Sequence, residues 1–220
     1  QMQTPVEITP LSVTVCGLRD SRNSILAQEN HGNDPSPYGT SYIAASYGKY
    51  IESAGARVVP IRINRKEAEY EKLFNSINGL LLPGGDVDIQ NSLFTRAAKI
   101  FYKLALKAND AGDYFPLWGT CQGLQQLTVL TANKYLSLSP QVFMTIVRDG
   151  SAQSSRLFKH FPKNLLKSLS QENITANFHH WSVSLQNFRV LLDVRGIPYS
   201  ETQIYGKNII YVENYYGYKK

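Results

Sequence analysis

The residues best suited to covalent chemistry form the run Gly-Thr-Cys-Gln-Gly at 119–123, which places one cysteine between two glycines. An apolar run at 115–118 precedes it, and a helix-like pattern follows it. A cysteine on a sharp turn between a strand and a helix is suited to attack an acyl carbon, because the positive end of the helix favours the thiolate over the thiol. The glycines permit a strained turn and close helix packing. The pattern therefore predicts Cys121 as a nucleophile.

Attack on an acyl carbon creates an oxyanion, which needs N–H donors close to the cysteine. The backbone N–H of Gln122 is one expected donor, and the Pro-Gly-Gly turn at 83–85 offers side-chain-free backbone for a second. The reaction also needs a proton acceptor for the thiol and a donor for the leaving amine, usually a histidine. The chain contains four histidines, which are His31, His160, His179 and His180. His31 and His160 lie in polar surroundings and are expected at the surface.

A purely structural interpretation of the cysteines stays open. Free cysteine is among the most buried residue types, so Cys121 is alternatively a small core residue beside turn glycines. Cys16 lies in an alternating, strand-like run and is expected to be inert. Two cysteines cannot form a disulfide framework, and no Cys-x-x-Cys or Cys/His cluster suggests a metal site. We therefore expect no zinc site of this kind.

The elements that must position these residues alternate between helix and strand. Apolar side chains at helical spacing predict three helices, marked by Ile43, Tyr47, Ile51 and Ala54, by Tyr70, Phe74 and Ile77, and by Leu93, Ala97, Phe101, Leu104 and Ala108. Apolar runs predict strands at 58–63, at 79–82 and at 115–120, and Gly55 is a helix stop. This alternation predicts an α/β three-layer sandwich with a mostly parallel central sheet.

The second half of the chain has a weaker pattern. Strands are expected at 141–147 and 188–194, a short helix at 164–169, and a tyrosine-rich strand near 208–220. No Pro/Gly/Ser-rich linker separates this half from the first, so a single domain over 1–220 is expected.

Composition narrows the classes of partner. The chain has 220 residues, 43% of them hydrophobic and 18% charged, which is typical of a globular protein. Its net charge of +6 comes from scattered Lys and Arg residues, so no nucleic-acid partner is expected. No apolar run is long enough for a membrane span, and no intact secretory signal is recognised. Asn173 begins a single glycosylation triplet.

Four longer runs of the sequence resemble one protein family. The runs YIAASYGKYIESAGARVVPI, LLPGGDVD, GDYFPLWGTCQG and TANFHHWSVS occur in this order. Together they resemble the gamma-glutamyl hydrolases, from about residue 24 to residue 188. The resemblance implies the class I glutamine amidotransferase-like (flavodoxin-like) architecture. It also implies cleavage of gamma-glutamyl bonds in folylpoly-gamma-glutamates or antifolate polyglutamates, without metal or cofactor. Such proteins are typically lysosomal, vacuolar or extracellular, and often homodimers.

The resemblance also implies roles for individual residues. Cys121 matches the nucleophile, while Gly85 and Gln122 match the backbone donors to the oxyanion. Gly84 belongs to the same turn and is expected to contact the oxyanion or the substrate. His179 matches a histidine of the substrate cleft, and His180 is expected to contribute to substrate binding.

Two blocks depart from the family pattern. Residues 1–23 match nothing in it, and "RDSRN" replaces the apolar start expected of the first strand. The Trp-His-Pro-Glu-like block that carries the family's catalytic histidine is absent from these residues, so the last strand and the catalytic loop are expected to be missing after residue 220.

The absent block leaves three interpretations, and the Gly-x-Cys-x-Gly turn adds a fourth. His179 or His180 acts as the base, although neighbouring side chains on a strand point to opposite faces, so only one would face Cys121. Alternatively, the chain is an impaired or inactive homologue that still binds polyglutamate, or it pairs with an intact subunit. A glutamine amidotransferase subunit is a further alternative, because that superfamily shares the Gly-x-Cys-x-Gly turn.

Overall fold

The computed structural model of the chain describes residues 22–31, 39–132, 139–140, 161–171, 181–182 and 209–212. From residue 39 to residue 132 its strands and helices alternate almost without exception. In chain order, the elements are β1 (Arg22–Leu26), β2 (Gln28–Glu29), β3 (Ser41–Tyr42), α1 (Ala45–Ser53), β4 (Arg57–Ile61), α2 (Glu67–Phe74), β5 (Gly79–Leu82), α3 (Leu93–Asp110), β6 (Leu117–Thr120), α4 (Gln122–Ala132), β7 (Ser139–Pro140), α5 (Lys163–Gln171), β8 (Trp181–Ser182) and β9 (Ile209–Val212).

The central sheet has five strands in the order β4-β1-β5-β6-β9, and every neighbouring pair is parallel. Leu82 of β5 lies opposite Gly119 of β6, so these two strands end at the same edge of the sheet. The short pairs β2–β3 and β7–β8 are antiparallel. The prediction of a mostly parallel central sheet is confirmed.

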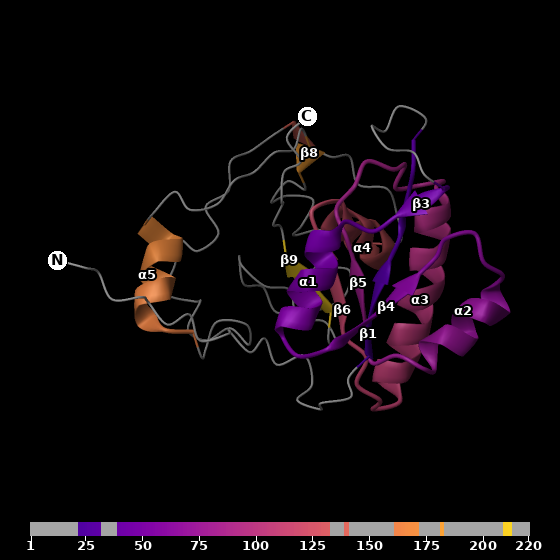
Figure 1. Ribbon diagram of the computed structural model, residues 1–220, viewed down its shortest axis with the longest axis horizontal. Helices are drawn as coiled ribbons and strands as arrows, with labels where there is room; N and C mark the ends of the chain where they lie inside the picture. Colours follow the sequence, from indigo (N-terminus) through magenta and orange to yellow (C-terminus); the bar gives the residue numbers. More distant parts are fainter. Residues whose placement is uncertain are drawn as a thin grey trace.

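Helices cover both faces of this sheet, and Figure 1 shows its strands between α1 and α3. Side chains alternate along β5: Leu80 and Leu82 pack in a large cluster with residues of α2, α3 and α4, while Leu81 packs with α1. Because successive side chains of a strand point to opposite faces, this alternation separates the two layers. The helix–sheet–helix layering expected from the sequence is therefore present.

The three predicted helices are present, although Ile43 precedes α1 and Ile77 follows the end of α2. The chain leaves α1 through Gly55, which has a left-handed φ of 85°. Helix α3 begins after Ser92, whose hydroxyl accepts the Thr95 N–H at 3.0 Å as an N-cap. Of the predicted apolar stripe of α3, Ala97 and Phe101 are completely buried, while Leu93, Leu104 and Ala108 are partly buried against the same core.

The first strand differs from the sequence expectation. Arg22 and Asn23, assigned above to an atypical segment, already belong to β1, where Asn23 pairs with Val58 of β4. The Arg22 N–H donates to Asn78 Oδ1 at 2.9 Å, and the Ser24 hydroxyl donates to Gly79 O at 2.8 Å. Hydrogen bonds thus support a strand start that lacks apolar residues.

Parts of the second half fall within the described residues. Helix α5 matches the short helix expected at 164–169, and β9 matches part of the expected terminal strand. The strands expected at 141–147 and 188–194 lie outside the described residues, as does Cys16. The single domain over 1–220 stays a prediction. Among the helices that are described, none is long and apolar enough to cross a membrane.

Candidate active site

Cys121 forms the turn between a strand and a helix by itself. Strand β6 ends at Thr120 and α4 begins at Gln122, so a single residue makes the reversal. Its φ is 54°, in the left-handed region that costs a residue with a side chain about 1–2 kcal/mol. Its carbonyl accepts the Leu124 N–H at 3.0 Å and so starts the hydrogen bonding of α4. The strained elbow predicted from the glycine pattern is present.

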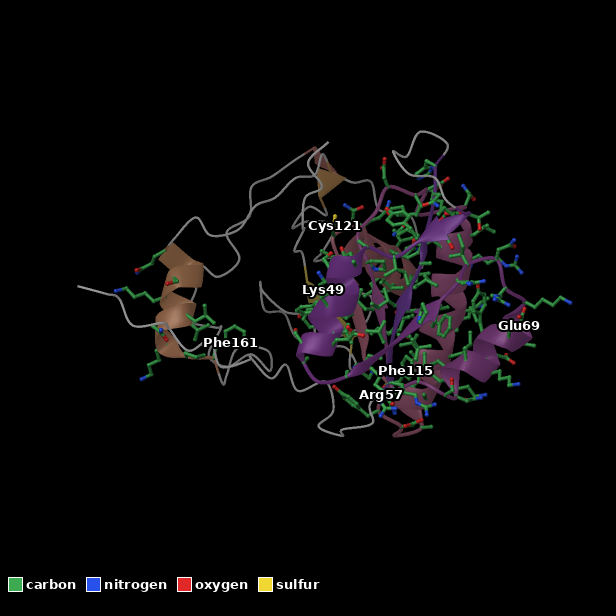
Figure 2. All side chains as sticks on the ribbon, viewed as in Figure 1. Lys49, Arg57, Glu69, Phe115, Cys121 and Phe161 are labelled. Carbon is green, nitrogen blue, oxygen red and sulfur yellow. The ribbon has the colours of Figure 1, made fainter. Side chains whose placement is uncertain are left out.

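The location of this elbow agrees with the topology. Figure 2 shows Cys121 at one end of the sheet, with Arg57 and Phe115 toward the opposite end. Arg57 begins β4 and Phe115 precedes β6, so Cys121 lies at the carboxyl ends of the parallel strands. Ligand sites of open parallel sheets form at this edge. The residue is only 9% exposed, so the cysteine is mostly shielded from water.

The two glycines around the cysteine are required by close packing. A Cβ at Gly119 would lie 2.6 Å from the Gly123 carbonyl oxygen, and a Cβ at Gly123 would overlap the Leu82 carbonyl group. The first turn of α4 therefore packs directly on the backbone of β5. This contact brings the end of β5 to the cysteine.

The loop that follows β5 (residues 83–88, hereafter the 83–88 loop) lies against the thiol. A Cβ at Gly84 would be 3.1 Å from Cys121 Cβ and 3.5 Å from Sγ. The Gly84 N–H donates to the Tyr47 hydroxyl oxygen at 2.8 Å, which links the loop to α1. The Pro-Gly-Gly turn and the cysteine, predicted from separate parts of the sequence, are therefore neighbours.

Two glutamine side chains connect the 83–88 loop to its surroundings. Gln122 Nε2 donates to Val87 O at 2.6 Å, and its Oε1 accepts the Val87 N–H at 3.1 Å. Gln28 Nε2 lies 3.3 Å from Gln122 Oε1 and 3.4 Å from Pro83 O. Both amides are buried. They hold the loop at its first residue and at its fifth.

The end of the loop is fixed to α3. Asp88 O accepts the Ser92 N–H at 3.2 Å and the Thr95 hydroxyl at 3.1 Å. The Asp88 carboxylate accepts hydrogen bonds from the Gln90 N–H and from the side chain and N–H of Asn91. These bonds, chiefly that from Gln90, lower the pKa of Asp88 below its usual value.

The two backbone N–H groups expected to bind the oxyanion are not used in hydrogen bonds to other described residues. Within the part of the chain that the structure describes, the N–H groups of Gly85 and Gln122 donate to no protein acceptor. Gln122 begins α4, where the first N–H groups of a helix have no acceptor within the helix. An N–H group that directly follows a cysteine and has no acceptor is suited to stabilise negative charge on a substrate oxygen.

The structure brings together four of the six predicted site residues: Gly84, Gly85, Cys121 and Gln122. His179 and His180 lie outside the described residues, as does His160. His31 is exposed, as expected, and its Nε2 lies 3.0 Å from Asp86 O on the 83–88 loop. No group of three or more His, Cys, Asp or Glu side chains arranged for a metal ion occurs among the residues whose placement is described.

Sequence reasoning missed two residues that contact the loop. Tyr47 was assigned only to an apolar stripe, yet its hydroxyl needs a hydrogen-bond partner when buried and finds one in Gly84. Gln28 follows the apolar end of the first strand. A polar residue at the carboxyl end of a parallel strand is a usable signal for a site, and it was overlooked.

Comparison with known proteins agrees with this geometry. The family model of peptidase C26 matches residues 23–191. The chain is 52% identical to the gamma-glutamyl hydrolase of Rattus norvegicus over 169 residues, covering 74% of this chain and 52% of the relative. It is 49% identical to the gamma-glutamyl hydrolase of Homo sapiens over 167 residues, covering 74% of this chain and 52% of that relative.

More distant relatives carry related names. The chain is 40% identical over 161 residues to gamma-glutamyl hydrolase B of Dictyostelium discoideum, covering 69% of this chain and 45% of the relative. The chain thus spans about half the length of the curated relatives it matches. The matched family segment runs from the second residue of β1 through α4 and includes the whole candidate site. This chain belongs to the peptidase C26 family.

Proposed function

We propose that this chain is a cysteine hydrolase that cleaves gamma-glutamyl bonds in folylpoly-gamma-glutamates or in antifolate polyglutamates. The observation that carries the proposal is the position of Cys121. It is a strained residue between β6 and α4, and the backbone of the 83–88 loop lies against its thiol. The names of the family relatives supply the bond type.

In the proposed reaction, Cys121 Sγ attacks the γ-carbonyl carbon of the substrate. A C–S bond forms, and the carbonyl π electrons move to the oxygen, where the N–H groups of Gly85 and Gln122 stabilise the charge. Collapse of this intermediate breaks the C–N bond and leaves a thioester on Cys121. The departing amine takes a proton, and water then hydrolyses the thioester and restores the thiol.

The proton carrier in this proposal is His179, which corresponds by position to a histidine of the family's substrate cleft. It would take the thiol proton and return it to the leaving amine. Gly84 and His180 would contact the substrate. By family resemblance, we extend the proposal to a homodimer in a lysosomal, vacuolar or extracellular location.

Cleavage of a pteroyl-γ-pentaglutamate by the purified chain tests this function. Released glutamate and shortened folates are measured by mass spectrometry for the wild type, for Cys121→Ala and for Cys16→Ala. We expect cleavage by the wild type and by Cys16→Ala, and loss of at least about 10³-fold in Cys121→Ala, because the nucleophile is absent.

Two outcomes would contradict the proposal. A folded wild-type chain that binds the substrate but releases no more glutamate than Cys121→Ala would be a polyglutamate-binding protein. Ammonia release from free glutamine, without cleavage of the polyglutamate, would indicate a glutamine amidotransferase subunit.

A further inference from the structure

The buried side chains of Gln28 and Gln122 form a polar contact next to the cysteine, hereafter the amide pair. Gln28 is 1% exposed and Gln122 is 8% exposed. The two residues are 94 positions apart in the chain and come from different elements, β2 and α4. Buried amides without a role are rare because removing their polar groups from water is costly. The pair therefore requires an explanation that the apolar core does not provide.

The orientation of each amide follows from its backbone partners. The Val87 N–H must meet the oxygen of Gln122, and the Val87 carbonyl must meet its nitrogen. Gln122 Oε1 and Pro83 O are both acceptors, so the Gln28 group that faces them has to be the NH₂. The chain of contacts from Val87 through both glutamines to Pro83 consequently has a single consistent arrangement.

This arrangement bears on one backbone group in particular. Between Pro83 and Val87 lies Gly85, the expected oxyanion donor of the loop. A Cβ added at Gly85 would overlap the Gln28 amide, so the Gly85 backbone lies directly on that side chain. The other expected donor is the backbone N–H of Gln122 itself. One residue thus carries a donor and, through its side chain, holds the loop that carries the other.

We propose that Gln28 and Gln122 are positioning residues that set the distance between the two oxyanion donors, the N–H groups of Gly85 and Gln122. The inference rests on the proposed function, because it assigns these N–H groups to an acyl-transfer reaction at Cys121. The amide pair acts through the backbone of the 83–88 loop and of α4, and the side chains themselves do not contact the reacting atoms.

Two thiol reactions separate positioning of the donors from general support of the fold. The first is reversible addition of Cys121 to N-(4-aminobenzoyl)glutamate γ-aldehyde. A C–S bond forms, the carbonyl π bond opens, and the thiol proton ends on the oxygen of the hemithioacetal; nothing is oxidised and no group leaves. Because an oxyanion develops, this reaction depends on the N–H donors. The second is alkylation of Cys121 by iodoacetamide, which displaces iodide and develops no oxyanion.

The variants are Gln28→Met and Gln122→Met, which keep the length of the side chain but remove the amide. The matched control is Gln126→Met. Gln126 is a fully buried glutamine one turn further along α4, whose Oε1 lies 2.8 Å from the Thr95 hydroxyl oxygen. Among the described residues its amide makes no hydrogen bond to the 83–88 loop, and its connection to that loop runs only through Thr95 to the last residue, Asp88. Circular dichroism and thermal unfolding establish that each variant is folded. If one of the two test variants does not fold, the other carries the same comparison.

We expect the aldehyde to bind about 10-fold more weakly to Gln28→Met and about 10- to 100-fold more weakly to Gln122→Met, because misplacing a donor weakens its bond to the oxyanion. Alkylation rates should stay within about 2-fold of the wild type, since that reaction uses no donor. Gln126→Met should match the wild type in both reactions.

Three results would overturn the inference. Unchanged aldehyde affinity in folded Gln28→Met and Gln122→Met would show that the donors need no amide pair, with the proposed function intact. Equal losses in both reactions, shared by Gln126→Met, would mean that the amides only support the fold. A wild-type chain that is alkylated but does not bind the aldehyde would refute the proposed function, and the inference with it.

Discussion

Two groups of glycines in this molecule have opposite properties. Those around the candidate site have ordinary φ values but no room for a side chain, and they are Gly84, Gly85, Gly119 and Gly123. Those in surface turns have φ between 84° and 87° and open space around the Cα, and they are Gly39, Gly55 and Gly112. The first group allows close approach to the backbone, by other backbone at Gly119 and Gly123 and by side chains at Gly84 and Gly85. The second permits a conformation that other residues rarely adopt.

The difference identifies which residue is strained at the site. In the Gly-Thr-Cys-Gln-Gly turn the left-handed conformation belongs to Cys121, and the glycines on either side relieve steric contact. A left-handed φ points the side chain in a direction that it would not have in a strand or in a right-handed helix. The strain is therefore confined to the residue whose side chain has to project from the turn.

The largest expected effect is that of Gly123→Ala. The new Cβ would overlap the carbonyl group of Leu82, the last residue of β5, which pairs with Gly119 of β6 and cannot move without disturbing that pairing. We expect a loss of about 3 kcal/mol or more in the free energy of unfolding, measured by urea denaturation. A loss below about 1 kcal/mol would mean that α4 can move away from the sheet, and that close approach does not explain this glycine.

The next effect concerns the contact between α1 and the 83–88 loop. In Gly84→Ala the Cβ would lie 2.9 Å from the Tyr47 hydroxyl oxygen, so we expect a loss of about 1–2 kcal/mol. Removing that oxygen with Tyr47→Phe should reduce the cost of Gly84→Ala by about 1 kcal/mol in a double-mutant cycle. The control is Tyr70→Phe, which removes a hydroxyl bonded to Arg65 N–H and Arg62 O, and should leave the cost unchanged.

Much of this arrangement follows from local sequence patterns. The apolar run at 79–82 and the stripe of α3 predicted their elements closely, because burial on one face or on both imposes a period that a single chain segment displays. The elbow was predictable for a similar reason, because the apolar run, the glycines and the helical pattern around Cys121 are all close together in the chain.

What escaped prediction depends on residues far apart in the chain. Whether a glycine is needed for space or for conformation depends on what lies opposite it, as the Leu82 carbonyl does for Gly123. Gln28 and Gln122 are 94 positions apart in the chain, and no local pattern in the sequence indicates that their side chains are in contact. Arg22 and Asn23 were not assigned to the first strand because both are polar, although their backbone pairs with β4.

A smaller effect tests the strain at Cys121 directly. Glycine tolerates a φ of 54° and alanine does not, so Cys121→Gly should be more stable than Cys121→Ala by about 1 kcal/mol. Urea denaturation of the two variants gives the difference without any contribution from the thiol. If the alanine variant were equally or more stable, the left-handed conformation would carry no cost, and the contrast between the cysteine and its neighbouring glycines would fail.

The smallest effect should have the opposite sign and comes from Gly48, in the interior of α1. A Cβ there would meet no atom within 4 Å, and its φ is not left-handed, so neither property that explains the other glycines applies. Gly48→Ala should therefore stabilise the protein by about 0.5–1 kcal/mol, because glycine loses more backbone entropy than alanine when a helix forms.

The matched control for Gly48→Ala is Gly55→Ala, at the end of the same helix with equally open space but a φ of 85°. That change should destabilise by about 1 kcal/mol, since only the conformation separates the two positions. Thermal unfolding of both variants would measure the difference. Equal shifts would mean that open space alone decides the outcome at glycines away from the site.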